Sequence, residues 1–246
     1  MFQGFYNLAS NMIVQNRNMN VISNNMANIS TPGYKSDQLV QGTFRDEILY
    51  RYENGNRTQI GETSRINTAE EKATNYAQGG LEQTGRKLDV GLNGNGFFAV
   101  QNGNETVYTR NGSFNVDNEG YLVVQGIGRV LGENGPIRVN TDDIYVSQQG
   151  YVLSSDGSEI YGQLRVVDFQ DYNQLEKTTG GAFRTNAQPQ AAQGTLVQQG
   201  YLESSNVSMV KEMTNMMSGQ RALQSSAQLL KMYDQLSGKA IELGTL

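Results

Sequence analysis

Two stretches of helical periodicity lie at opposite ends of the chain. In the first, apolar residues recur at alternating steps of three and four, with Gln15 in the one gap, at Phe5, Leu8, Met12, Met19, Ile22, Met26 and Ile29. This heptad seam is typical of a helix packed along a partner helix. Pro32 and Gly33 end the pattern, because proline disfavours helix in the residue before it and glycine permits a sharp turn.

The second stretch has the same alternation. It runs through Met209, Met213, Met216, Gln220, Leu223, Ala227 and Leu230, and then drifts to Leu229, Tyr233, Leu236 and Ala240, as a straight helix drifts against a seven-residue repeat. Ser204, Ser205 and Asn206 precede it and are residue types that cap helix N-termini. Two seams at opposite ends of one chain are expected to pair with each other as a coiled coil.

The middle of the chain alternates with a period of two, which predicts β-strands. Apolar positions alternate at 88–92, 98–100, 114–116, 137–139 and 164–166. Asn-Gly and Asp-Gly dipeptides stand between these segments, and both tolerate the positive φ of tight hairpin turns. The pattern predicts a compact antiparallel domain.

The patterns together predict an α+β protein, in which long terminal helices pair and an antiparallel β domain is inserted between them. The expected parts are an N-terminal helix in 1–34, an extended connecting segment with short strands in 35–79, a β-rich domain in 80–184, a polar return segment in 185–204 and a C-terminal helix in 205–246.

The first helix has an almost uncharged outer face. From Met1 to Tyr34 the only charged residue is Arg17, and the positions away from the seam are mostly Asn, Ser and Gln. Asparagine is a mediocre helix former, so this helix is expected to be weak in isolation. An uncharged amide surface suits close packing of identical copies, because like charges at every contact would repel. An ordinary two-helix stalk in a monomer or dimer fits the same pattern.

The composition narrows the possible chemistry. The chain has no His, Cys or Trp, so the imidazole base, the thiolate nucleophile and the usual zinc ligands are absent. A net charge of -5 disfavours binding to nucleic acid, which needs a cationic face. The first ten residues carry no base and no long apolar run comes after them, so we expect neither a Sec signal peptide nor a transmembrane segment.

Three short motifs resemble ligand sites but are better explained as turns. Residues 94–99 (GNGFFA) fit the dinucleotide pattern G-x-G-x-x-A, yet residues 100–110 indicate a strand rather than a helix. Residues 115–120 resemble the start of a calcium loop, but Gly126 stands where a bidentate Glu is required. Asp142 and Asp143 would point to opposite faces of a strand. We therefore expect no cofactor, no metal and no catalytic residue, and a protein that is not an enzyme.

Several motifs, in order along the chain, resemble the flagellar basal-body rod and hook protein family. They are residues 24–35 (NNMANISTPGYK), 78–90 (QGGLEQTGRKLDV), 94–100 (GNGFFAV), 108–114 (YTRNGSF) and 200–207 (GYLESSNV). The positions that match the family signature include Asn24, Asn25, Asn28, Pro32, Gly33, Tyr34, Gly94, Gly96, Phe97 and Asn206.

The resemblance implies a structural axial subunit of the flagellar basal body in the cell envelope, exported through the flagellar type III apparatus. Its partners would be copies of itself and other rod and hook subunits. The paired terminal helices would form an inner tube around the export channel, with the β domain outside, and would transmit torque. The apolar seam residues of both helices would form the assembly interface. The length fits a rod subunit, proximal or distal, better than the longer hook protein.

Two other functions fit parts of the pattern. A glycan- or peptidoglycan-binding β module on a helical stalk would require an exposed aromatic platform. A carboxylate-dependent hydrolase would require a cleft with two converging acids.

Overall fold

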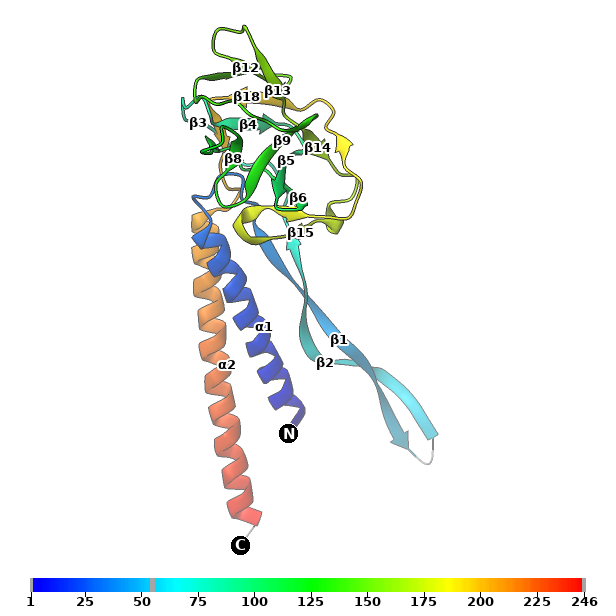
Figure 1. The fold of residues 1–246 in the computed structure, drawn as a ribbon. Helices are drawn as coiled ribbons and strands as arrows, with labels where there is room; N and C mark the ends of the chain where they lie inside the picture. Colours follow the sequence, from blue (N-terminus) through cyan, green and yellow to red (C-terminus); the bar gives the residue numbers. More distant parts are fainter. Residues whose placement is uncertain (1, 54–55, 245–246) are drawn as a thin grey trace. The chain divides into compact units, whose positions relative to one another are not determined.

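The computed structural model of the chain describes residues 2–53 and 56–244 (Figure 1). The chain divides into two compact units. The helical unit comprises residues 1–27, 37–74 and 208–246, and the β unit comprises residues 28–36 and 75–207. The α+β class expected from the sequence is confirmed, because two terminal helices flank a region of antiparallel strands.

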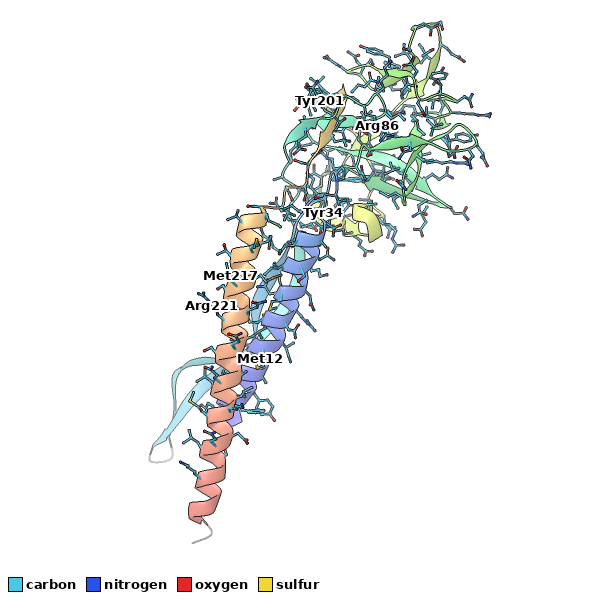
Figure 2. The ribbon with its side chains drawn as sticks, turned by 90° about the vertical axis from the view of Figure 1, so that its left-hand side faces the viewer. Met12, Tyr34, Arg86, Tyr201, Met217 and Arg221 are labelled. Atoms are coloured by element: carbon cyan, nitrogen blue, oxygen red, sulfur yellow. The ribbon has the colours of Figure 1, made fainter. Side chains whose placement is uncertain are left out.

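The helical unit is built on two antiparallel helices, α1 (Phe2–Ala27) and α2 (Met209–Gly244), which lie side by side in Figures 1 and 2. Asn25 reaches Glu212 near one end of the pair, Met19 lies against Gly219, and Gly4 lies against the Tyr233 hydroxyl near the other end. The contact therefore follows the whole of α1, as expected for paired terminal helices.

The face of α2 that packs on α1 shares Met216, Leu223, Leu230 and Tyr233 with the predicted seam and differs from it by one position elsewhere. Steps of three and four connect the contact residues Glu212, Gly219 and Tyr233, and place Met216, Leu223, Ser226 and Leu230 on the same face. Met209, Met213 and Leu236 instead have exposed side chains. The periodicity missed the other positions of this face, Glu212, Gly219 and Ser226, because glycine, serine and glutamate carry no hydrophobic signal.

The N-terminal helix is covered on more than one side. It packs against α2 and against both strands of a hairpin, β1 (Asp37–Glu53) and β2 (Asn56–Thr74). Its most buried apolar residues are Val14, Val21 and Ile22, whereas Phe5 is exposed. The predicted seam contains Ile22 but not the two valines, because a single heptad stripe describes contact with one partner only.

The hairpin is longer than the short strands expected in the connecting segment. Its strands pair antiparallel from Asp37 opposite Thr74 to Glu53 opposite Asn56, with irregularities after Val40 and Leu49. Polar residues fill most of this stretch, so it lacks the apolar alternation that marks a strand in the sequence.

The β unit contains short antiparallel strands and two 3-10 turns, with the bounds β3 Leu81–Gln83, β4 Val90–Asn93, β5 Phe97–Asn102, β6 Glu105–Thr109, β7 Phe114–Val116, β8 Leu122–Val124, β9 Gly128–Gly132, β10 Gly135–Pro136, β11 Ile144–Val146, β12 Tyr151–Ser154, β13 Ile160–Gln163, β14 Val166–Asp168, η1 Tyr172–Gln174, β15 Glu176–Lys177, η2 Thr179–Gly181, β16 Phe183–Arg184, β17 Gln190–Ala191, β18 Leu196–Gln199 and β19 Tyr201–Glu203. The largest sheet has the order β15-β16-β6-β5-β9-β8-β7, and β14 also pairs with β5. Three smaller sheets are β11-β12-β13, β18-β4 and β19-β3. Of the predicted strands, 137–139 forms only a single bridge, at Arg138.

Strand β5 separates two hydrophobic clusters. Phe98 and Val100 point into one, while Phe97 and Ala99 point into the other, as expected from the alternation of side chains along a strand. All four are at most 1% exposed. The strand therefore lies at the centre of the β unit.

Glycine serves two different purposes here. Gly103 closes the turn between β5 and β6 with φ +61°, and a side chain there would meet nothing. Gly112 instead lies against the backbone, where an added Cβ would stand 1.7 Å from the Val90 carbonyl oxygen. The Asn111-Gly112 pair thus marks a close approach of two chain segments.

We expect Gly112→Ala to lower the free energy of unfolding of the β unit by about 3 kcal/mol or more, because the methyl group and the Val90 carbonyl cannot share the same space. Gly103→Ala is the matched control and should cost about 1–2 kcal/mol, from its positive φ alone. Urea denaturation of both variants measures the difference. Equal losses would contradict the close approach.

Candidate assembly site

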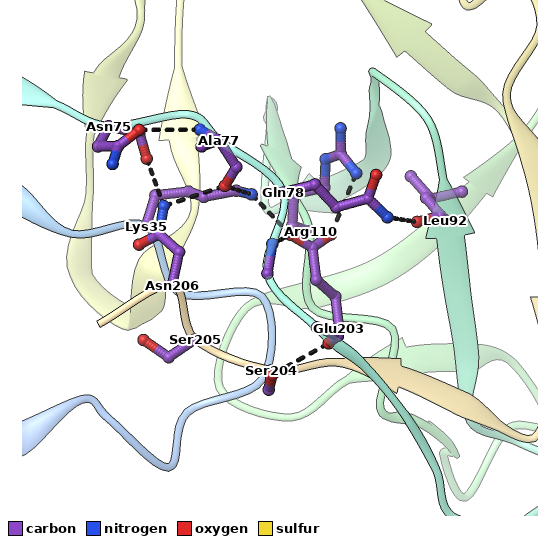
Figure 3. A network of polar contacts seen from close by, with 12 residues as sticks. Lys35, Asn75, Ala77, Gln78, Leu92, Arg110, Glu203, Ser204, Ser205 and Asn206 are labelled. Atoms are coloured by element: carbon purple, nitrogen blue, oxygen red, sulfur yellow. Dashed lines mark hydrogen bonds and ion pairs between the residues drawn. The ribbon is translucent and has the colours of Figure 1, made fainter. Parts of the chain in front are cut away.

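A buried ion network in the β unit joins three segments that are far apart in the sequence (Figure 3). The Glu203 carboxylate accepts hydrogen bonds from Lys35 Nζ at 2.6 Å and from the Arg110 guanidinium at 3.1 Å. The three side chains are between 1% and 4% exposed. Removing one member of such a buried network leaves the others uncompensated, so each depends on the rest.

Backbone groups complete the network. Lys35 Nζ also donates to the Ala77 carbonyl at 2.8 Å, and the Gly79 amide donates to Glu203 at 3.0 Å. Arg110 donates to the Gly94 carbonyl at 2.8 Å. Burial lowers the pKa of Lys35 below its ordinary value, while the adjacent Glu203 carboxylate opposes that shift.

The signature residues Gly33 and Tyr34 lie beside this network. The Gly33 amide donates to the Glu203 carbonyl at 2.7 Å, and its φ of +68° favours glycine. An added Cβ there would lie 2.3 Å from the Arg110 backbone. The Tyr34 ring is buried and lies 3.7 Å from Lys177 Nζ, a cation–π contact.

The side-chain amide of Asn206 forms hydrogen bonds with backbone groups of neighbouring segments. Its Oδ1 accepts from the Ser36 amide at 2.8 Å, and its Nδ2 donates to the Asn75 and Ala77 carbonyls at 2.8 and 3.0 Å. The Ser204 hydroxyl donates to the Gly80 carbonyl (Figure 3).

The prediction that Ser204, Ser205 and Asn206 cap the C-terminal helix is therefore wrong. Their side chains bond within the β unit, Ser205 accepting from the Val207 amide. Helix α2 begins later, at Met209, where the Ser208 carbonyl accepts the Glu212 amide at 3.0 Å. Residue type alone does not distinguish a cap from a tertiary hydrogen bond.

The remaining signature residues have separate places. Gly94 and Gly96 have φ of +123° and +129° just before β5, and Phe97 lies in the second hydrophobic cluster with Arg110 5.4 Å from its ring centroid. Asn28 accepts from the Thr31 hydroxyl in the turn after α1. Asn24 is exposed and Pro32 is half-buried.

Asn25 acts inside the helical unit. Its Nδ2 donates to the Asp37 carbonyl at 2.8 Å, and its Oδ1 accepts from the Asp37 amide at 3.0 Å. The side chain is 1% exposed and thus pairs with the start of β1 as a neighbouring strand would. This pairing ties the hairpin to α1.

A groove of about 420 Å³ opens in the helical unit between α1, α2 and the first residues of β1. Its lining is mainly polar and includes Gln15, Asn18, Asn25, Asp37, Glu212 and Asn215. Glu212 is 9% exposed, although it lies in the first turn of α2.

The motifs that resemble ligand sites act as turns. Strand β5 comes directly after residues 94–96, with no helix N-terminus to receive a pyrophosphate. Asp117 accepts the Glu119 and Tyr121 amides and pairs with Arg129, so it closes the turn between β7 and β8. Within residues 2–53 and 56–244, no group of acidic side chains is arranged to hold a metal ion.

The Tyr172 hydroxyl lies at the edge of the second hydrophobic cluster. Tyr172 stacks on Tyr76 with ring centroids 4.9 Å apart, and its hydroxyl donates to Asp168 at 2.6 Å. Burial, together with the hydrogen bond to Asp168, raises the pKa of Tyr172 to about 12.

Comparison with known proteins identifies three matching family domains. Residues 5–35 match the flagella basal body rod protein family, residues 91–154 match the flagellar hook protein FlgE/F/G D1 domain, and residues 198–243 match the flagellar basal body rod FlgEFG protein C-terminal domain. These segments cover both ends and the middle of the chain.

Relatives that match over more than nine-tenths of the chain carry names of the same family. The flagellar basal-body rod protein FlgF of Caulobacter vibrioides is 31% identical over 239 residues, covering 95% of this chain and 94% of the relative. FlgG of Bacillus subtilis is 29% identical, with 99% of both chains covered. FlgG of Buchnera aphidicola subsp. Schizaphis graminum is 33% identical, covering 93% of this chain and 95% of the relative.

The comparisons give no support to the glycan-binding alternative. The structure also shows, for the residues it describes, no helix with the length and apolar character needed to span a membrane.

We expect Glu203→Gln to lower the free energy of unfolding of the β unit by about 3–5 kcal/mol, because Lys35 and Arg110 would then be buried without a counter-charge. Glu105→Gln is the control, since its pair with Arg184 is exposed, and it should change stability little. Denaturant titration compares the two. A small loss for Glu203→Gln would contradict the network's role.

The raised pKa of Tyr172 predicts an alkaline loss of stability. A group with a pKa of 10.0 when unfolded and about 12 when folded contributes fully below pH 10, and its contribution disappears as pH rises through 12. We expect the stability of Tyr172→Phe to fall less steeply between pH 10 and 12, as measured by denaturant titration at each pH. Identical slopes would refute this.

Proposed function

The chain belongs to the flagellar basal-body rod protein family, and we propose that its helical unit is the part that polymerises with other copies into a tube around the export channel. The protein is a structural subunit of the basal-body rod, located in the flagellar basal body, and not an enzyme. The chain is about as similar in sequence to a relative named FlgF as to a relative named FlgG, so the proposal covers a proximal or a distal position in the rod.

The exposure of apolar side chains is the observation that best supports polymerisation through the helices. Large apolar side chains are exposed along both helices, at Phe5, Tyr6, Ile13, Met209, Val210, Met213, Met217, Leu229, Met232 and Leu236. Met217 lies on the side of α2 away from α1 (Figure 2). Extended apolar surface of this kind marks a protein interaction site.

The predicted interface residues then fall into two groups. Ile22 is buried, and Leu8, Met12, Met19, Met26, Met216, Leu223 and Leu230 are half-buried within the helical unit. Phe5, Met209, Met213 and Leu236 are exposed and are proposed to contact other copies. Ile29 is half-buried in the β unit, outside the helix pair.

The partners are inferred from the same proposal. The subunit assembles with other rod and hook subunits, as its family indicates. Heterologous contacts that do not close on themselves generate a helical tube. The subunit is further proposed to be exported unfolded through the flagellar type III apparatus, and weak terminal helices would add little to the stability that must be overcome before export.

We expect Leu223→Asp and Leu8→Asp to block incorporation into the rod while the β unit stays folded, because each places a carboxylate in the helix pair. Gln224→Asp is the control, carrying the same charge on an exposed neighbour. Immunoblots of isolated basal bodies and far-UV circular dichroism of the purified chains provide the measurements. Normal incorporation of Leu223→Asp would argue against the proposal.

Deletion of the gene tests the function as a whole. Electron microscopy of basal bodies from the deletion strain should show rings without a complete rod and without hook or filament. Complete rods in that strain would overturn the proposed function.

A further inference from the structure

The groove of the helical unit contains an acid without a cation. Among the described residues, no lysine or arginine pairs with the Glu212 side chain. Its one side-chain hydrogen bond comes from Asn25 Nδ2 at 3.5 Å, the long limit for such a bond. A carboxylate that is only 9% exposed normally has a cationic partner or several short hydrogen bonds, so within one chain Glu212 relies on the solvent of the groove.

The position of Glu212 in α2 does not remove this requirement. The positive end of the helix dipole stabilises an acid in the first turn, but such an acid usually keeps its carboxylate in water. Here the side chain lines the groove together with Asp37 and several amides. Of the described residues that line the groove, Lys211 is the one cation, and Glu212 does not pair with it.

The N-terminal helix carries one cation that also lacks a partner. Arg17 is exposed, and among the described residues no acid pairs with it. Spacings of seven and four place Tyr6, Ile13 and Arg17 on one face of α1, where Tyr6 and Ile13 are 63% and 58% exposed. This face combines a single positive charge with uncovered apolar surface.

Arg17 cannot reach Glu212 within one chain. Glu212 contacts Asn25, which lies eight residues from Arg17 along α1, so the two charges are separated by about 12 Å along the helix axis. An ion pair between them therefore requires two copies.

We propose that Arg17 of one copy enters the groove of a second copy and pairs with Glu212, while Tyr6 and Ile13 cover the groove rim. This inference rests on the proposed polymerisation and names a specific contact within it. The contact is heterologous, because the donor face and the acceptor groove are different surfaces, and it can therefore repeat along a tube. The planar guanidinium suits a groove lined by carboxylates and amide oxygens.

The absence of cysteine from the chain permits a direct test. Arg17→Cys and Glu212→Cys chains with different tags are co-expressed with the native chain, and isolated basal bodies are treated with a short bis-maleimide cross-linker. We expect a cross-linked dimer containing one chain of each kind. A bridging reagent is used because a disulfide needs Cα atoms within about 7 Å, whereas the long side chains of an Arg–Glu pair can hold their Cα atoms further apart. Asn16→Cys replaces Arg17→Cys in the control, since it projects about 100° away on the same helix and should not cross-link.

Charge variants give a second readout. Arg17→Gln should reduce incorporation into basal bodies on the order of tenfold or more, since Glu212 would remain buried without a cation. The double variant Arg17→Glu with Glu212→Arg should recover most of the loss, because every copy then offers the reversed pair.

The outcomes separate this inference from the proposed function. Assembled rods without the mixed cross-linked dimer, or with Arg17→Gln at the native level, would overturn the Arg17–Glu212 contact while the rod function stands. A cross-link from Glu212→Cys to a different rod protein would overturn the second copy as the partner. Absence of the unmodified chain from basal bodies would instead overturn the proposed function and the inference together.

Discussion

The polar pairing of the two terminal helices is the interaction on which the account depends. Their contact includes Gly4, Gly219, Ser226 and the buried pair Asn25 and Glu212, so much of it is small or polar rather than apolar. The apolar residues of this contact, such as Leu8, Met19 and Leu223, are only half-buried. Their burial, at about 25 cal/mol per Å², has to offset a backbone ordering cost of roughly 1–2 kcal/mol per residue. We therefore expect the helix pair to be specific in register and weak in stability.

The β unit has the opposite character. Phe97, Phe98, Ala99 and Val100 are fully buried on both faces of β5. The Glu203 network joins residues 35, 110 and 203 in the interior of the same unit. A firmly packed β unit and marginal helices within one chain suit a subunit that folds its β unit alone and completes its helical unit in contact with neighbours.

The sequence predicted the terminal helix pair, the antiparallel middle and the family, because apolar periodicity and ordered motifs carry that information. It could not predict the Glu203 network, since Lys35 lies 168 residues away and charge pairing leaves no periodic signal. The predicted seam of α2 coincides with the contact face at Met216, Leu223 and Leu230 but is one position away at Gly219 and Ser226, because these two residues have no hydrophobic signal. The caps of α2 were wrong because Asn206 forms tertiary hydrogen bonds instead.

Hydrogen exchange of the backbone amides of α1 tests the central claim most directly. The account predicts that amides from Asn7 to Asn28 exchange rapidly in the dilute purified chain, while the amides of β5 stay protected, and that the same α1 amides become protected in assembled rods. Full protection of α1 in the dilute chain, unchanged on assembly, would contradict it.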